Sequence, residues 1–89
     1  MEEAEKQDYV KQMIDYITLE IIRRPGIEIT ERSPLVSSGL IDSLALVNIL
    51  LHLEDVTRLR IPAGKVQPKD MDTVDLMMAT AQRLGKPRK

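Results

Sequence analysis

Apolar residues recur at three- and four-residue intervals in this chain, which is the spacing of one face of an α-helix. The first such stretch runs from Tyr9 to Ile22, and its apolar positions are Val10, Met13, Ile14, Ile17 and Ile21. Pro25-Gly26 should end it, because proline lacks a backbone N–H and glycine admits positive φ. The pattern therefore predicts a first helix and then a long loop. Within the loop we expect Ser33 to be an N-cap and Pro34 the first residue of at most one helical turn around Leu35-Val36.

Two apolar stripes follow the stretch from Ser43 to Thr57, where we predict the second helix. On a helical wheel the first stripe forms one arc, which predicts the core face, and its members are Leu46, Ile49, Leu50, Leu53 and Val56. The second stripe lies beside Ser43 on the wheel and consists of Leu44, Val47 and Leu51. Because a small bundle has limited means to bury both, we predict that the second stripe is a docking face for partner proteins. The alternative is a helix that is buried on two sides.

The rest of the pattern predicts one short and one longer helix. Arg58 to Pro62 should be extended or loop, and a short helix is expected around residues 66–71. Asp72-Thr73 is predicted to cap a final helix, which Gly85 and Pro87 end. The apolar face of this helix is formed by Val74, Met77, Met78, Ala81 and Leu84.

The length of 89 residues fits one small domain, which we expect to span 1–89 with an ordered core from about 8 to 85. The acidic start around Glu2-Glu3 and the basic tail Lys86–Lys89 are expected to be solvated ends. Phe and Trp are absent, so the core must be aliphatic. A core of this kind favours interlocking helices over an aromatic-rich sheet.

Charge and composition narrow the classes of function. The net charge of −1 and the lack of an aromatic platform argue against nucleic-acid binding. No apolar run is long enough to span a bilayer, and the start lacks the basic residues of a signal peptide, so we expect a cytoplasmic protein. Cysteine is absent, which excludes disulfides and thiolate nucleophiles. Any thioester chemistry would need an imported thiol.

Asp42 and Ser43 stand where the loop meets the second helix. The Asp42 carboxylate can accept hydrogen bonds from N–H groups of the first helical turn, which makes it a strong N-cap candidate. Ser43 is then the first helical residue, and a phosphate on its hydroxyl would lie at the positive end of the helix dipole. Asp-Ser before an apolar run is also a common helix start without further chemistry.

A longer motif favours the chemical interpretation. The string Leu35-Val36-Ser37-Ser38-Gly39-Leu40-Ile41-Asp42-Ser43-Leu44 resembles the phosphopantetheine attachment motif of acyl and peptidyl carrier proteins. This resemblance implies that Ser43 is esterified to 4'-phosphopantetheine, whose thiol holds cargo as a thioester, and that Asp42 helps a phosphopantetheinyl transferase to recognise the site. It also implies an all-α, four-helix bundle of the acyl carrier protein type, with three long helices and one short.

The same resemblance implies that the protein is a carrier rather than an enzyme. It would present cargo to an acyl or aminoacyl ligase or transferase and then to downstream enzymes, and we expect it to be a monomer. Carriers of fatty acid synthesis usually have an acidic second helix, whereas Ala45, Asn48 and His52 stand here, and Thr57 replaces a common phenylalanine. Residues 68–73 are similar to free-standing aminoacyl carriers. We therefore favour a stand-alone carrier of a small acyl or aminoacyl group, with a fatty-acid or polyketide carrier as the alternative.

Other chemistries find little support in the sequence. The only histidine, His52, lies nine residues after Ser43, which is about 13.5 Å along a helix and on its other side, so it cannot serve as a base. Ala45 stands where a nucleophile elbow requires glycine, and His52 has no metal-ligand spacing, so we expect it to be a surface residue. Gly39 alone does not make a phosphate-binding loop. The remaining alternative is a small helical interaction module without a prosthetic group, in which Leu44, Val47 and Leu51 bind a partner helix.

Overall fold

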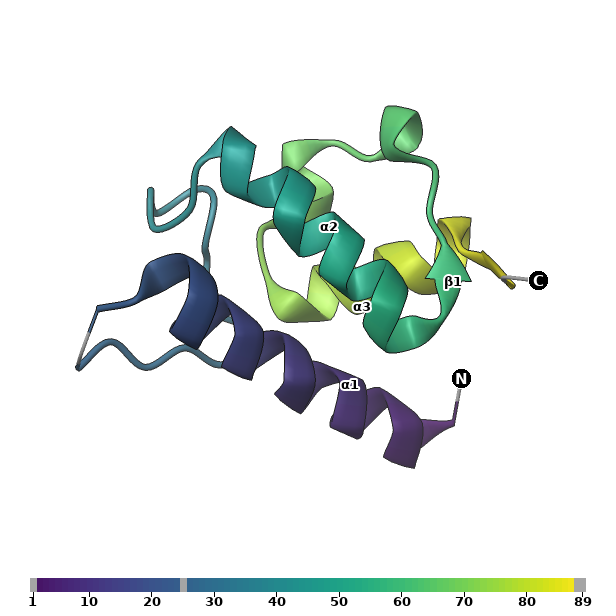
Figure 1. Cartoon of the computed structure of the whole chain (residues 1–89), viewed down its shortest axis with the longest axis horizontal. Helices are drawn as coiled ribbons and strands as arrows, with labels where there is room; N and C mark the ends of the chain where they lie inside the picture. Colours follow the sequence, from purple (N-terminus) through teal and green to yellow (C-terminus); the bar gives the residue numbers. More distant parts are fainter. Residues whose placement is uncertain (1, 25, 88–89) are drawn as a thin grey trace.

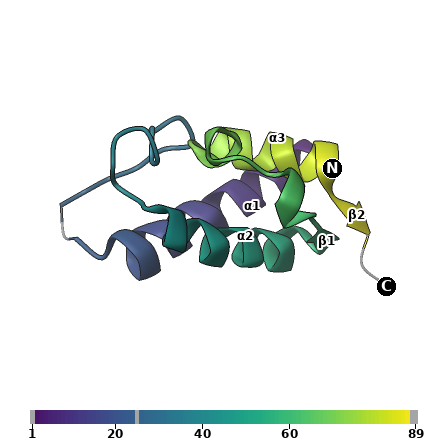
Figure 2. The same cartoon turned by 90° about the horizontal axis from the view of Figure 1, so that it is seen from above.

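Three α-helices form most of the protein, for which a computed structural model describes residues 2–24 and 26–87. Helix α1 spans Glu3–Tyr16 and continues as a π-helix, η1, over Ile17–Ile22. After a long loop, α2 spans Ser43–Thr57, and α3 spans Val74–Leu84. Figure 1 shows α2 crossing in front of α3, with α1 beside both, and Figure 2 shows α2 and α3 in separate layers.

The first helix starts earlier than the apolar pattern predicts. It begins at Glu3 rather than at Tyr9, because exposed polar residues extend it beyond the part that packs on the core. Acidic residues in a first turn interact favourably with the helix dipole, and Tyr9 Oη donates a hydrogen bond to Glu5 at 3.2 Å. The predicted end at Ile22 is confirmed, with Arg23 in the left-handed conformation directly after it. Pro25 lies outside the described residues.

Aliphatic side chains from all three helices and from the loops fill the core. On α2 the predicted core stripe divides, since Ile49 and Leu53 are fully buried whereas Leu46, Leu50 and Val56 are half-buried. The predicted face of α3 is confirmed as buried, with Leu84 partly exposed at its end. The other buried apolar residues are Met13, Ile17, Ile22, Ile29, Leu35, Ile41, Ile61 and Met71.

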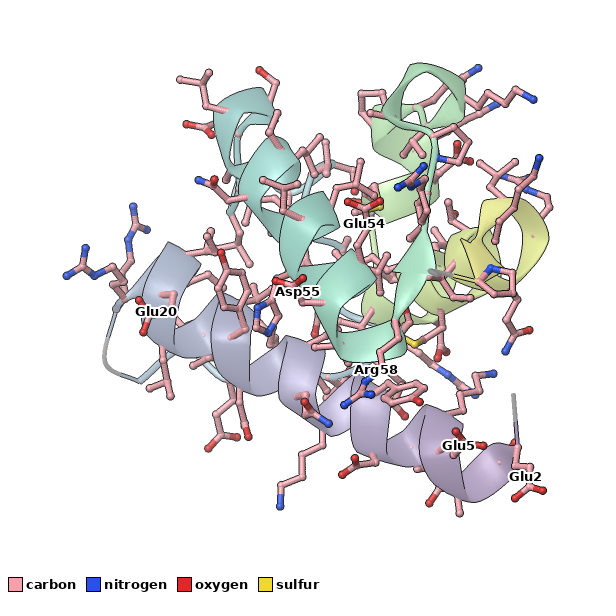
Figure 3. The ribbon with its side chains drawn as sticks, turned by 45° about the vertical axis from the view of Figure 1, so that its right-hand side comes forward. Glu2, Glu5, Glu20, Glu54, Asp55 and Arg58 are labelled. Atoms are coloured by element: carbon pink, nitrogen blue, oxygen red, sulfur yellow. The ribbon has the colours of Figure 1, made fainter. Side chains whose placement is uncertain are left out.

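A two-stranded antiparallel sheet joins two segments distant in sequence. Strand β1 spans Leu59–Arg60 and pairs with β2, Lys86–Pro87. Arg88 and Lys89 lie outside the described residues. Both residues of β2 are exposed, as expected of a solvated end, but their backbone is paired, which was not expected. Such pairing is a tertiary contact, which local patterns do not encode. Gly85 permits it, because a Cβ at this position would lie 2.9 Å from the Leu59 side chain. Directly after β1, the N–H of Ile61 donates to Glu54 Oε2 at 2.8 Å and ties this segment to α2. Figure 3 labels Glu54 on α2.

The chain is therefore a small, mostly helical domain, but a four-helix bundle is not clearly formed. The short helix expected around residues 66–71 is a 3-10 turn, η3, over Pro68–Met71. A second 3-10 turn, η2, which was not predicted, spans Ala63–Lys65. Pro68 opens η3, and its side chain fixes φ without supplying an N–H donor. None of the helices in the described residues has the length and apolar character needed to cross a membrane.

Candidate functional site

The start of α2 has the geometry that the sequence predicts. Asp42 is the N-cap, in an extended conformation, and its Oδ1 accepts the N–H of Ala45 at 2.8 Å. Ser43 is the first helical residue, and it is exposed. Asp42 thus takes up the Ala45 N–H, while the N–H groups of Ser43 and Leu44 have no acceptor within the helix. The Ser43 hydroxyl is therefore accessible beside backbone donors and the positive end of the helix dipole.

The loop before α2 is held by a residue whose role the sequence analysis missed. Asp72, which was predicted to help cap α3, instead points its carboxylate at residues 35–37. Its Oδ1 accepts the backbone N–H groups of Leu35, Val36 and Ser37 at 3.1, 2.8 and 2.9 Å. Its Oδ2 accepts the Ser37 hydroxyl at 2.9 Å. At the start of α3, the Thr73 hydroxyl accepts the N–H of Leu76 at 3.0 Å, and the Glu31 carbonyl accepts the N–H of Asp75 at 2.9 Å.

These hydrogen bonds favour the charged form of Asp72. The backbone hydrogen bond from Ser37 makes the largest contribution, and it lowers the pKa of the carboxyl below its ordinary value. The signal in the sequence was an Asp next to the cap residue of α3, but nothing local shows that it accepts donors 35 to 37 residues earlier. The arrangement joins the motif loop to the start of α3.

Ser33 does not make the predicted cap. Its hydroxyl accepts the N–H of Thr30 at 2.8 Å, so the turn that follows depends on Asp72 for its partners. Within this turn Leu35 and Ile41 are buried and anchor the loop, with Ile41 N–H bonded to the Leu35 carbonyl at 3.1 Å. Gly39 has φ of +82°, a backbone conformation that side chains disfavour. The shape of the loop thus depends on the buried Leu35 and Ile41, on the Asp72 carboxylate and on Gly39.

The second apolar stripe of α2 is exposed. Leu44, Val47 and Leu51 are 78%, 59% and 55% exposed, and we call these three residues the α2 apolar face. The alternative prediction, that α2 is buried on two sides, is therefore wrong for the isolated chain. The reason is geometric, since α1 and α3 both pack on the opposite side of α2, around Ile49 and Leu53.

A groove with a volume of about 210 Å³ lies beside Ser43. One wall is α2, and the other is the segment that contains the two 3-10 turns. Its lining is mostly apolar and consists of Ser43, Leu46, Val47, Leu50, Ala63, Val66, Gln67, Pro68 and Met71. A flexible group attached to Ser43 would have this groove directly next to it.

His52 occupies a different position from the expected one. It is half-buried, and its ring stacks on that of Tyr16 with centroids 3.8 Å apart and planes within 8°. The stack joins α2 to α1, so His52 is an interhelical packing residue rather than a free surface residue. In the described part of the chain, no three His, Cys, Asp or Glu side chains group as they would around a metal ion.

Comparisons with protein-family models, with curated proteins and with solved structures find no match to this chain. The site must therefore be interpreted from its own geometry and from the motif. It combines an exposed hydroxyl at a capped helix start, a fixed loop, an apolar groove and an exposed apolar helix face.

Proposed function

We propose that this protein is a carrier that holds an acyl or aminoacyl group as a thioester on 4'-phosphopantetheine attached to Ser43. The observation that supports this most directly is the exposed Ser43 hydroxyl at the Asp42-capped start of α2, within the motif that ends at Leu44. We further propose that α1, α2, α3 and the η3 turn correspond to the three long helices and one short helix of the carrier protein bundle. The protein then acts as a substrate and partner of enzymes, not as an enzyme.

The chain's own residues fit such a group. Ser43 offers a solvent-accessible oxygen for the phosphodiester, and the free N–H groups of the first turn favour the negative charge beside it. When attached, the arm supplies the thiol that a chain without cysteine lacks. Asp42 keeps Ser43 at the first helical position through its bond to Ala45 N–H, and the Asp72 contacts hold the preceding loop in the shape that a transferase would meet.

A small cargo is the favoured form of this proposal. Met77 and Met78 fill the interior next to α2 and are fully buried, and Thr57, buried at the far end of α2, donates its hydroxyl to the Leu53 carbonyl at 2.7 Å. The apolar groove beside Ser43 favours the second candidate, a fatty-acid or polyketide carrier, because it could cover part of a longer chain. A long acyl group bound there would raise the melting temperature, whereas a small cargo would change it little.

The proposed partners are a phosphopantetheinyl transferase, a loading ligase or transferase, and downstream enzymes, with docking on the α2 apolar face. A monomer in the cytoplasm suits this role. The exposed Leu44, Val47 and Leu51 would equally serve a helical interaction module without a prosthetic group. The two proposals differ in one respect, because only a carrier must be modified at a serine.

Enzymatic modification of Ser43 distinguishes the carrier from the interaction module. The purified chain is incubated with coenzyme A and a broad-specificity phosphopantetheinyl transferase, and its intact mass is measured. We expect the increment of one phosphopantetheine on the unchanged chain and on Ser38→Ala, which alters a nearby exposed loop serine, and no increment on Ser43→Ala. An arm found on Ser43→Ala, or absent from the folded unchanged chain, would contradict the proposal. Intact mass of protein from its native host then reports the cargo.

A further inference from the structure

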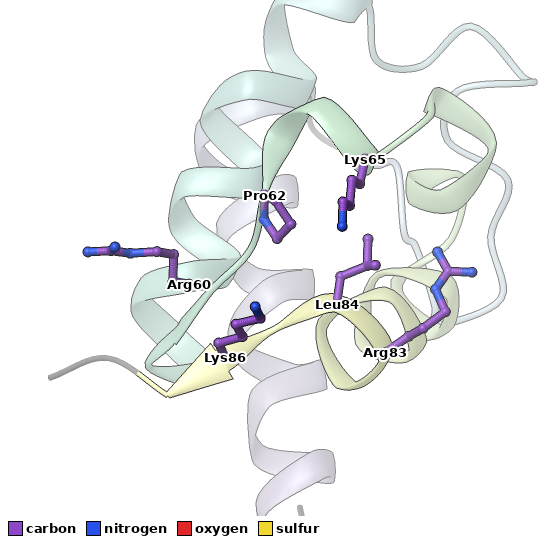
Figure 4. A pocket seen from close by; sticks show the side chains of 6 residues that line it. All are labelled: Arg60, Pro62, Lys65, Arg83, Leu84 and Lys86. Atoms are coloured by element: carbon purple, nitrogen blue, oxygen red, sulfur yellow. The ribbon is translucent and has the colours of Figure 1, made fainter.

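The charges of this chain are separated along its sequence. Residues 58–89 contain eight Lys or Arg and three Asp or Glu, whereas residues 1–57 contain five and eleven. Four of the later cations line one hollow with a volume of about 460 Å³. We call it the basic hollow, and it is lined by Arg60, Pro62, Lys65, Arg83, Leu84 and Lys86. In Figure 4, Lys65 and Lys86 point toward the hollow, whereas the Arg60 side chain points outward from its edge.

Local stability does not account for this clustering of charge. Arg60 and Lys86 are paired residues of β1 and β2, and like charges opposite each other in a sheet are destabilising. Lys65 on η2 and Arg83 on α3 complete the rim. The fold thus places four positively charged residues, from four different elements, around one hollow, and their mutual repulsion does not favour stability.

Little of this charge is neutralised within the protein. Over residues 2–24 and 26–87, Arg83 is the only one of the four cations in an ion pair, at 3.7 Å from Asp70 Oδ1. The Arg83 side chain is still 59% exposed, and the other oxygen of Asp70 accepts the N–H of Gln67. Between the cations, Pro62 and Leu84 give the hollow a half-buried apolar floor (Figure 4).

We propose that the basic hollow docks an acidic segment of a partner protein, with carboxylates at the four cations and an apolar side chain on Pro62 and Leu84. Arg60, Lys65, Arg83 and Lys86 are all exposed, so none is fixed by burial around a single small anion. Their long, mobile side chains suit several spaced carboxylates instead. A nucleic acid fits less well, because the net charge is −1 and no aromatic platform accompanies the cations.

The position of the basic hollow relates it to Ser43. One short segment lines both depressions, since Pro62 and Lys65 contribute to the basic hollow while Ala63 and Val66 contribute to the groove beside Ser43. A protein bound at the basic hollow would therefore stand next to that groove. The docking itself needs no group on Ser43 and so goes beyond the carrier proposal.

A binding titration tests the inference. The isotope-labelled full chain is titrated with a short synthetic peptide in which glutamates flank a leucine, and amide shifts are followed by NMR. We expect saturable shifts at Arg60, Lys65, Arg83 and Lys86 that weaken as salt is added. The double variant Arg60→Glu with Lys86→Glu should lose at least about tenfold in affinity, since two attractive charges become repulsive. The matched control, Lys11→Glu with Arg24→Glu, changes net charge equally at exposed sites elsewhere and should bind normally.

Several results would overturn the inference. Shifts spread over the whole surface, or an equal loss in the control, would reduce the effect to net charge. Tighter binding of inorganic pyrophosphate or of single-stranded DNA than of the peptide at these residues would assign the hollow to another class of ligand. Circular dichroism confirms that each variant is folded. Intact mass after treatment with transferase and coenzyme A reports Ser43 modification separately, so failure of either proposal is visible without the other.

Discussion

The two apolar sides of α2 have nearly the same composition and opposite surroundings. Ile49 and Leu53 are fully buried between α1 and α3, whereas Leu44, Val47 and Leu51 are more than half exposed. Hydrophobicity alone does not distinguish them, since both sides consist of large aliphatic residues. The difference lies in which side the other two helices cover. An exposed apolar patch beside a modifiable serine is a feature of interaction sites, since it gains no stability from solvent contact.

The largest expected effect comes from the buried side. Leu53→Asp places a carboxylate in an aliphatic core without a partner, which should lower the free energy of unfolding by several kcal/mol and unfold the domain at room temperature. Circular dichroism and the loss of dispersed amide resonances measure this. Leu53→Met, which nearly conserves volume, is the control and should remain folded. A folded Leu53→Asp protein would mean that the buried side has been placed wrongly.

The second-largest effect on stability is expected at Asp72, whose carboxylate holds the loop that precedes α2. Asp72→Ala removes the acceptor of the Val36 and Ser37 N–H groups and of the Ser37 hydroxyl, whereas Leu35 N–H keeps its 2.7 Å bond to the Asp72 backbone carbonyl. The substitution should lower the free energy of unfolding by about 1–3 kcal/mol. Urea denaturation measures the loss. Asp75→Ala, at an exposed ion pair of 4.0 Å, is the control and should lose less than about 1 kcal/mol.

The Asp72 contacts also predict a pH dependence. The pKa of Asp72 is lowered in the folded state, so the unfolded chain binds its proton more readily. The stabilisation is therefore complete above the unfolded value of 3.8 and declines as the pH falls through the lower folded pKa. Unfolding free energies measured from neutral to acidic pH should converge for the unchanged chain and Asp72→Ala. Parallel curves would show that ionisation of Asp72 does not contribute.

The third-largest effect on stability is expected at Asp42, the N-cap of α2. Asp42→Ala removes the acceptor for Ala45 N–H, which should lower the free energy of unfolding by about 0.5–2 kcal/mol. Under the carrier proposal it should also slow modification of Ser43 well below the melting transition. Asp42→Asn retains a capping oxygen and should recover most of the stability. If Asp42→Asn is also modified at Ser43 as fast as the unchanged chain, the transferase does not recognise the charge of Asp42.

The smallest effect on stability should come from the exposed side. Val47→Asp and Leu51→Asp should change the free energy of unfolding by no more than about 0.5 kcal/mol, in contrast to Leu53→Asp. Loading by the cognate ligase should nevertheless fall more than about tenfold, because apolar anchors at an interface contribute about 2 kcal/mol or more. His52→Ala serves as a control for loading, since His52 packs on Tyr16 rather than on the α2 apolar face. Normal loading of Leu51→Asp would remove docking from this face.

The main helices, the Asp42 cap, the exposed Ser43 and the two apolar sides of α2 can all be predicted from the amino-acid sequence. These features depend on residues a few positions apart, and helical periodicity and capping chemistry operate over that range. The sequence also supplied the motif on which the carrier proposal depends.

Four features could not be predicted in this way and follow from the packing of the chain. They are the role of Asp72, the pairing of β2 with β1, the stack of His52 on Tyr16 and the grouping of cations at the basic hollow. Each depends on groups that are far apart in the chain and are brought together by the packing of three helices. Local patterns do not specify which distant donor a carboxylate will meet, because that is fixed by how whole elements bury their apolar faces. For the same reason, the sequence could list the positive charges but could not show that four of them share one hollow.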